Sequence, residues 1–261
     1  MPEHGANADH GAGHVPSERP AFYALSPGGW RDWWTLLHPP YTLWHLSYVV
    51  IGASIAPDVD VRWTGETVVA FFLAMGLAAH ALDELHGRPL GTHIPSWALV
   101  GLAAVGLAGA VALGVHGMVQ VSPWIGIFIA VGAFLVVAYN LEVFGGAFHS
   151  DLWFALAWGA FPVLTAYFAQ TGVLTSGAVI AAAACAVLSA AQRVLSTPVR
   201  RLRRHVVNVR GEATLDDGTM EPLDRAVLLA APEKSLRLLS IAVPLIAAAL
   251  LVSSLARGQP V

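Results

Sequence analysis

Long hydrophobic runs separated by short polar stretches dominate the chain from residue 41 onwards. A helix needs about 20 consecutive apolar residues to cross the hydrocarbon core of a membrane. Runs that reach or approach this length lie at residues 41–56, 67–82, 97–115, 122–140, 152–169, 177–192 and 235–256. The pattern predicts an all-α integral membrane protein with about seven transmembrane helices in a single domain, residues 21–261.

The N-terminal end has a different pattern. Residues 1–20 are polar and rich in Gly, Ala and His, without the apolar core of a signal peptide, and we expect a disordered tail there. Next, Trp30, Trp33, Trp34 and Trp44 fit a segment at the level of the lipid headgroups, because indole rings prefer the membrane–water interface.

Composition agrees with the membrane class. Hydrophobic residues make up 56% of the 261 residues and charged residues only 12%, whereas charged residues are about 25% of an average soluble domain. The formal net charge is -3, and no basic, aromatic-rich stretch indicates a nucleic-acid partner. Cys185 is the only cysteine, which excludes a disulfide framework and a cysteine-based metal site.

The arginines predict the orientation. Residues 193–234 are the longest connection between hydrophobic runs and hold 7 arginines. Cytoplasmic loops of membrane proteins carry an excess of Arg and Lys, so this Arg-rich loop is expected in the cytoplasm. Counting back through the predicted spans puts the N-terminus inside as well. The chain is thus predicted to be a multi-pass protein of the cell membrane.

Ionisable residues from three predicted spans meet at the cytoplasmic side. His45 lies near the start of the first span, the sequence HALDELHGRP (residues 80–89) ends the second, and Glu142 and His149 follow the fourth. A charge within a span costs about 2.5–3.5 kcal/mol on insertion, so such residues usually face a cavity and have a partner. The topology predicts one polar site that faces the cytosol, with His116 at the opposite membrane face.

Imidazole and carboxylate groups from several helices are the ligands of iron and manganese centres in helical bundles. His80, Asp83 and Glu84 share one helix face, because they are three and four residues apart. The expected metal ligands are His45, His80, Glu84, Glu142 and His149. Asp83, His86 and Arg88 are the expected catalytic residues, the first two as further ligands or as groups that orient the imidazoles. Arg88 and Asn140 are expected to bind substrate, and one or two transition-metal ions, preferably iron, would be the cofactor.

Three stretches within residues 36–195 resemble the UbiA-type membrane prenyltransferases. LHPPYTLWHLSYVVIGASIAP is similar to the first helix of that family, LDELHGRPLGTHIPSWAL to the region after its second helix, and WGAFPVLTAYFAQTGVLTSGAVIAA to its middle helices. The resemblance implies a helical bundle with a cavity open to lipid and an active site that faces the cytosol. In that family the carboxylates of an aspartate-rich motif hold magnesium on a prenyl diphosphate.

The aspartate-rich motifs of that family are altered here. His80 stands near the position of the motif's asparagine, His86 has no counterpart, and no second aspartate-rich motif follows the sixth span. Magnesium prefers oxygen ligands, whereas imidazole favours iron, manganese, zinc or copper. The leading hypothesis is therefore a metal-dependent membrane oxidoreductase, a non-haem iron-type oxidase or oxygenase, that acts on a hydrophobic lipid or isoprenoid.

Two alternatives fit the same residues. A divergent prenyltransferase would hold magnesium at Asp83 and Glu84 and neutralise a diphosphate with Arg88, Arg193 and Arg200. A transporter or membrane scaffold would use the polar cluster as an ion path or as a network of ion pairs. In the second case the residues after His80 are the hydrated end of the span and pair with each other.

Overall fold

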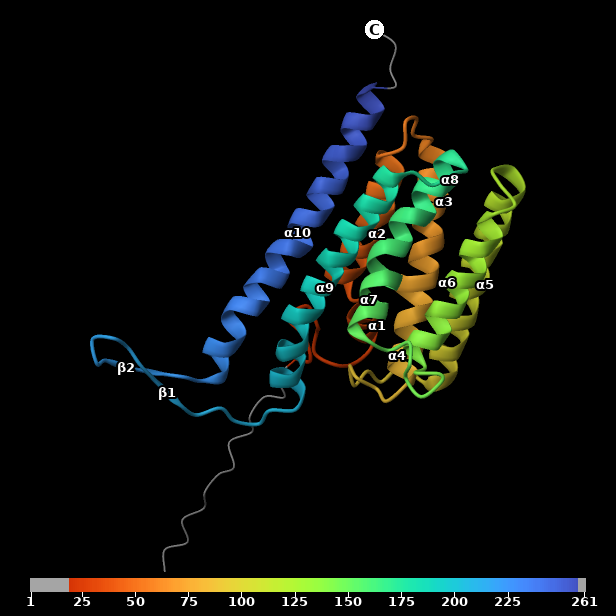
Figure 1. Ribbon diagram of the computed structural model, residues 1–261. Coiled ribbons are helices and arrows are strands. Elements are labelled where there is room, and N and C mark those ends of the chain that lie inside the picture. Colours follow the sequence, from red (N-terminus) through yellow and green to blue (C-terminus); the bar gives the residue numbers. More distant parts are fainter. Residues whose placement is uncertain (1–18, 258–261) are drawn as a thin grey trace, which may run out of the picture.

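The computed structural model describes residues 19–257, most of which lie in helices (Figure 1). The tail expected at residues 1–20 lies outside the described residues except for its last two positions. In chain order the elements are α1 (Trp30–Leu36), α2 (Pro39–Ser54), α3 (Val61–Phe71), the π-helix η1 (Phe72–Ala79), α4 (His80–Leu85), α5 (Ser96–Gln120), α6 (Ile125–Asn140), α7 (Asp151–Phe154), the π-helix η2 (Ala155–Ala160), α8 (Phe161–Thr171), α9 (Ser176–Arg204), the strands β1 (Glu212–Thr214) and β2 (Met220–Pro222), and α10 (Arg225–Arg257).

Within the described residues, five helices are long and apolar enough to cross a membrane. They are Val61–Leu85, which joins α3, η1 and α4; Ser96–Gln120; Asp151–Thr171, which joins α7, η2 and α8; Ser176–Arg204; and Arg225–Arg257. The predicted spans 41–56 and 122–140 correspond to α2 and α6, which have 16 residues each. Such a helix is about 24 Å long, less than the hydrocarbon thickness of about 30 Å. A mostly helical architecture is confirmed, with one short β-hairpin beside the helices, and the number of seven spans stays a prediction.

The helices pack side by side, with α5 and α6 along one edge of the bundle and α10 along the other (Figure 1). Helix α2 packs against both α8 and α10, and α9 packs against η2, α8 and α10. Helix α5 packs against α3, η1 and α4. Strands β1 and β2 pair antiparallel, with Glu212 opposite Pro222, and this hairpin extends away from the bundle at its lower end (Figure 1).

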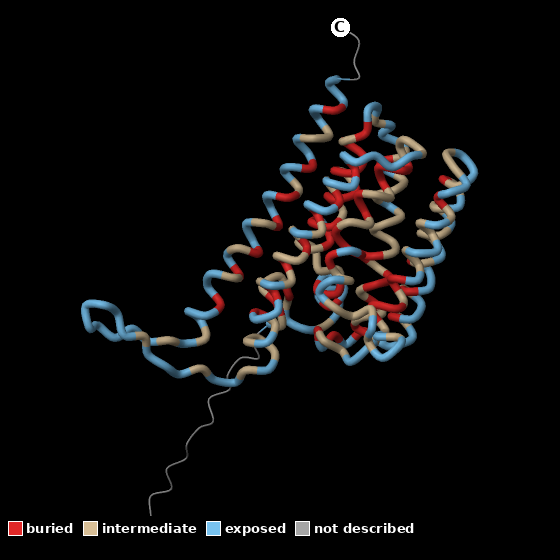
Figure 2. The backbone as a smooth tube through the Cα atoms, in the orientation of Figure 1, coloured by how far each residue is buried: buried red, intermediate tan, exposed pale blue. Residues whose placement is uncertain are grey.

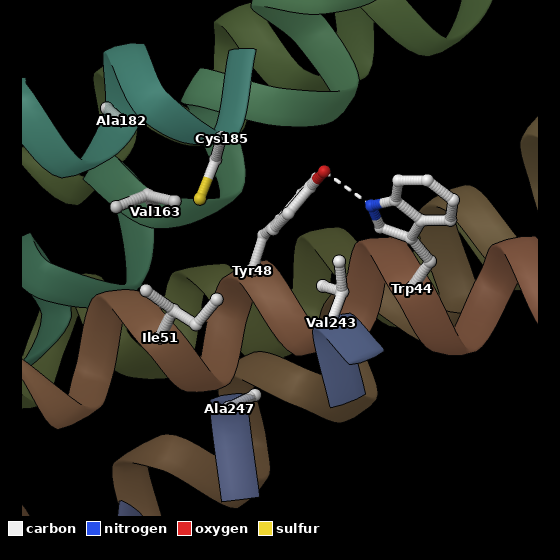
Figure 3. Packing of buried hydrophobic residues seen from close by; sticks show 8 residues of the cluster. All are labelled: Trp44, Tyr48, Ile51, Val163, Ala182, Cys185, Val243 and Ala247. Carbon is white, nitrogen blue, oxygen red and sulfur yellow. Dashed lines mark hydrogen bonds between the residues drawn. The ribbon is translucent and has the colours of Figure 1, made fainter. Parts of the chain in front are cut away.

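Buried residues lie on the helix faces that point to the interior of the bundle (Figure 2). One hydrophobic cluster joins four helices: Trp44, Tyr48 and Ile51 of α2, Val163 of α8, Ala182 and Cys185 of α9, and Val243 and Ala247 of α10 (Figure 3). Trp44 and Tyr48 are fully buried, and the indole Nε1 of Trp44 donates a hydrogen bond of 2.5 Å to the Tyr48 hydroxyl. Burial therefore leaves neither polar group unpaired, and the cluster holds the last helix against the first long one.

Two glycines allow helices to approach closely. A Cβ atom at Gly52 of α2 would lie 2.4 Å from the carbonyl oxygen of Val163 on α8. A Cβ atom at Gly159 of η2 would lie 2.7 Å from the Cα atom of Ala186 on α9. Real Cβ atoms do not make contacts this short. Interfaces between membrane helices are rich in small residues for this reason, so the packing agrees with the membrane class.

The Arg-rich connection is shorter than its predicted bounds. Helix α9 continues to Arg204 and α10 begins at Arg225, so the connection is residues 205–224 rather than 193–234. The hydrophobic signal ends at Gln192, but Arg and Leu favour helix, and arginine can bury its apolar stem along a helix while its charge stays hydrated. Five arginines that we expected in a loop therefore lie on helix α9: Arg193, Arg200, Arg201, Arg203 and Arg204.

Candidate functional site

A polar cavity of about 370 Å³ lies at the end of the bundle where α2 begins and α9 ends. Its walls come from residues 20–23, the start of α2, η1 with α4, the end of α6, the start of η2 with α7, and the last turns of α9. The sequence predicted that ionisable residues meet at this end. Five histidines border the cavity: His38, His45, His80, His86 and His149.

Two of these histidines are held through one ring nitrogen. The Nδ1 atom of His80 lies 3.1 Å from the carbonyl oxygen of Gly76, and that of His149 lies 2.9 Å from the carbonyl oxygen of Tyr139. A carbonyl oxygen only accepts, so Nδ1 carries the proton and Nε2 has a free lone pair. Metal-binding histidines are oriented by hydrogen bonds of this kind. His80 and His149 are therefore prepared to ligate through Nε2.

Four buried polar atoms at the cavity have no hydrogen-bond partner within residues 19–257. They are His38 Nε2, His45 Nε2, Tyr139 Oη and Gln192 Oε1. Buried polar groups in native proteins almost always have a protein or water partner. The cavity therefore offers both donor and acceptor capacity to a polar ligand, a metal ion or water.

His38 and Tyr23 belong to the cavity wall although the sequence did not indicate them. His38 precedes α2 in a left-handed conformation (φ 46°), and its ring stacks on that of His80 with 4.4 Å between centroids. Its Nδ1 atom lies 3.0 Å from the Tyr23 hydroxyl. Burial lowers the pKa of His38 well below its usual value and raises the pKa of Tyr23. The spacing of seven residues between His38 and His45, about two helical turns, was the available signal.

Carboxylate and amide groups complete the predicted part of the cavity. Asp83 of α4, Asn140 at the end of α6 and Glu142 after it all border the cavity. The Oε1 atom of Glu142 lies 3.9 Å from His149 Nδ1. Among the predicted site residues, the structure thus brings together His45, His80, Asp83, His86, Asn140, Glu142 and His149. Within residues 19–257, no three His, Cys, Asp or Glu side chains form a ready-made metal site as they stand.

Glu84, a predicted ligand, does not border the cavity. Its side chain is fully buried, and both oxygens accept hydrogen bonds from the loop after α4. Oε1 accepts from the amide and the hydroxyl of Thr92, both at 2.8 Å, and Oε2 accepts from the amide of Leu90 at 2.9 Å. Buried backbone amides require hydrogen-bond acceptors. The Glu84 carboxylate accepts from the loop amides and is therefore directed away from His80.

Arg88 and His116 also lie outside the cavity. Arg88 adopts a left-handed conformation (φ 52°), and its guanidinium donates to the carbonyl oxygen of Ile94 and to the hydroxyl of Ser96. It therefore braces the same loop as Glu84 and does not reach the predicted substrate position. His116 pairs instead with Glu66, with 2.8 Å between His116 Nδ1 and Glu66 Oε2.

The last turns of α9 add three arginines to the cavity. Arg193, Arg200 and Arg204 share one helix face, because they are seven and four residues apart, and all three border the cavity. Arg193 pairs with Asp151 at 2.8 Å, and Arg204 Nε donates to the carbonyl oxygen of Pro20 at 3.4 Å. Together with Asp83 and Glu142, these residues make the cavity more basic than acidic. The sequence analysis assigned Arg193 and Arg200 to the prenyltransferase alternative but placed them in a loop, so it did not predict that they share a helix face with Arg204.

A second, apolar cavity lies next to the polar one. It has a volume of about 120 Å³ and is lined by α3, η1, α5, α6, η2 and α8. Met75 of η1 and Trp158 of η2 border both cavities. Short π-helical segments in α-helices often occur at functional sites, and here two of them meet at the wall between the polar and the apolar space.

The fold and the cavities describe a helical bundle suited to a membrane, with a polar chamber at one end and an apolar one beside it. Comparison of the chain with protein-family models, with curated proteins and with solved structures finds no match. The resemblance to UbiA-type prenyltransferases therefore depends on the three sequence stretches alone.

Proposed function

We propose that this chain is a membrane-embedded, metal-dependent oxidoreductase with a non-haem iron-type centre in the polar cavity. The observation that carries the proposal is the Nδ1 anchoring of His80 and His149, which leaves Nε2 of each ring available to a metal. His45, whose buried Nε2 has no partner in the described chain, is the third ligand. Asp83 or Glu142 would supply the carboxylate. A transition metal held there would supply redox and oxygen-activating chemistry.

The proposed substrate is a lipid or an isoprenoid. An amphiphilic molecule can place its reacting end in the polar cavity and its chain in the apolar cavity beyond Met75 and Trp158. Asn140 would orient the polar end, because it is buried at the cavity and its Nδ2 is already committed to the carbonyl oxygen of Val136, which leaves Oδ1 as an acceptor. We place the protein in the cell membrane, with the cavity and residues 205–224 on the cytoplasmic side.

Metal binding tests the proposal. Detergent-purified protein, loaded with Fe(II) without oxygen and then desalted, should retain about one or two iron ions. His80→Ala should weaken iron affinity by at least about 10–100-fold, because loss of a residue that only hydrogen-bonds to a metal ligand already has an effect of that size. The control is His116→Ala, which lies outside the cavity. All three proteins keep residues 1–18, so histidines there cannot account for a difference. Equal iron content in the three proteins, or none in the wild type, would contradict the proposal.

A divergent UbiA-like prenyltransferase is the second candidate. Asp83 faces the same cavity as Arg193, Arg200 and Arg204, an arrangement that suits magnesium and a diphosphate. In that case the purified protein releases diphosphate from a prenyl diphosphate with magnesium, and Asp83→Asn abolishes the release. His80→Ala would then have little effect, which separates the two candidates.

A further inference from the structure

A groove of about 500 Å³ lies between the end of α9 and the start of α10, outside the polar cavity. Its lining combines charged and apolar residues: Arg203, Arg225, Glu233, Lys234, Arg237, Ala226, Leu229 and Ala230. Four of these side chains are cationic and one is a carboxylate. The groove therefore has a net positive charge.

The one carboxylate in the groove is already neutralised. Glu233 is buried and forms an ion pair with Arg203. Within residues 19–257, Lys234 and Arg237 have no ion-pair partner. The guanidinium carbon of Arg237 lies 4.9 Å from the ring centroid of Phe22, which holds this side chain in place. Two uncompensated cations thus face an open groove, where they attract an anion.

The cations continue into an apolar stripe along α10. Lys234, Leu238, Ile241 and Leu245 follow one another at intervals of four, three and four residues and share one helix face. The three apolar members are 58%, 59% and 64% exposed, and exposed positions recur along the whole of α10 (Figure 2). A free phosphate ion would use only the charged end of this surface. A lipid would use both parts.

We propose that the groove binds the phosphate-bearing headgroup of an anionic phospholipid, whose acyl chain lies along the apolar stripe of α10. Basic pockets between membrane helices on the cytoplasmic side bind anionic headgroups in this way. Lys234 and Arg237 contact the phosphate, while Leu238, Ile241 and Leu245 contact the chain. The inference does not depend on the reaction that takes place in the polar cavity.

Thermal unfolding of the detergent-purified full chain tests this site. Short-chain phosphatidylglycerol should raise the melting temperature, whereas short-chain phosphatidylcholine and inorganic phosphate should not. In the double variant Lys234→Gln/Arg237→Gln, the phosphatidylglycerol concentration for half of the shift should rise by about tenfold or more. The matched control is Arg201→Gln/Arg210→Gln, which removes the same charge from exposed residues outside the groove.

Three results would overturn the proposal. An equal shift with phosphatidylcholine would mean that the headgroup charge is not recognised. An equal shift with inorganic phosphate would show a site for a soluble anion and no role for the stripe. An equal loss in both double variants would show a general effect of net charge. A loss confined to the Lys234/Arg237 variant supports the site.

Discussion

The histidines at the polar cavity are held through different partners, and this decides what each substitution removes. His80 and His149 donate to backbone carbonyls, so alanine at either position removes an acceptor Nε2 and leaves no side chain unpaired. His38 differs, because its Nδ1 lies beside the Tyr23 hydroxyl. Removal of the His38 ring leaves the half-buried Tyr23 hydroxyl without this partner, which costs at most about 1–3 kcal/mol.

We expect the protein to lose stability as the pH falls below about 6.5, the ordinary pKa of histidine. Because folding lowers the pKa of His38, the unfolded chain binds a proton in that range that the folded chain does not. This group alone contributes at most about 1.4 kcal/mol per pH unit. His38→Asn keeps an acceptor for Tyr23 and removes the titration. Its melting temperature should fall less than that of the wild type between about pH 7.5 and 5.5; parallel falls would contradict the assignment.

Glu84→Gln should reduce stability without reducing metal binding. The amide of glutamine presents a donor where the three groups of Leu90 and Thr92 already donate, so the free energy of unfolding should fall by about 1–3 kcal/mol. Glu221→Gln is the control, because Glu221 is exposed and lies outside the polar cavity, so the change should affect neither stability nor iron. Thermal unfolding and iron analysis measure both effects. Lost iron with unchanged stability would show that Glu84 is a ligand, as the sequence first indicated.

At the scale of elements, helix α9 shows what the hydrophobic pattern can and cannot predict. The pattern located its apolar part, residues 177–192, because burial in a membrane requires a continuous run of apolar side chains. It missed the last turns of α9, where the apolar run has ended. Arg193, Arg200 and Arg204 lie on one face of these turns, and other residues lie on the remaining faces. Their helical state depends on packing and on helix propensity, so an Arg-rich stretch alone does not distinguish a loop from a helix end.

The close approach of α2 and α8 predicts a difference between two glycines. Gly52→Leu places side-chain atoms where the backbone of Val163 lies, and should destabilise the protein by about 1–3 kcal/mol or more. Gly101→Leu is the matched control, since Gly101 is exposed on α5 and nothing lies within 4 Å of an added Cβ atom. Melting temperatures in one detergent compare the two. Similar temperatures would mean that α2 and α8 are not in tight contact.

The predicted orientation is tested by the loops at opposite ends of the bundle. In a Cys185→Ala background, a cysteine at exposed position Glu221 should react with a membrane-impermeant reagent only after the cells are opened. A cysteine at exposed position Asp58 should react in intact cells. Labelling of the Glu221→Cys variant in intact cells would invert the topology and place the polar cavity outside.

At the scale of the whole molecule, the sequence predicted where the polar residues gather better than it predicted their directions. His45, His80 and His149 lie at one end of the bundle. The lengths of the helices and of their connections determine at which end a residue lies. The direction of a side chain depends on which local group it satisfies. Glu84 turns to the loop amides, while His38, at the residue before α2, turns into the cavity. The directions of these side chains depend on contacts between segments of the chain, and the sequence of a single segment does not specify such contacts.

Anomalous X-ray scattering at the iron edge, from crystals of the iron-loaded protein, locates the metal directly. We expect a peak inside the polar cavity, within a coordination distance of about 2.0–2.2 Å of Nε2 of His80 and His149, with His45 as the third imidazole. Because the described side chains form no ready-made site, the segments that carry these rings must approach one another when the metal binds, with both Nδ1 hydrogen bonds kept. Anomalous density confined to other histidines, or an empty polar cavity in crystals that hold iron elsewhere, would contradict the central claim that this chamber is a metal centre.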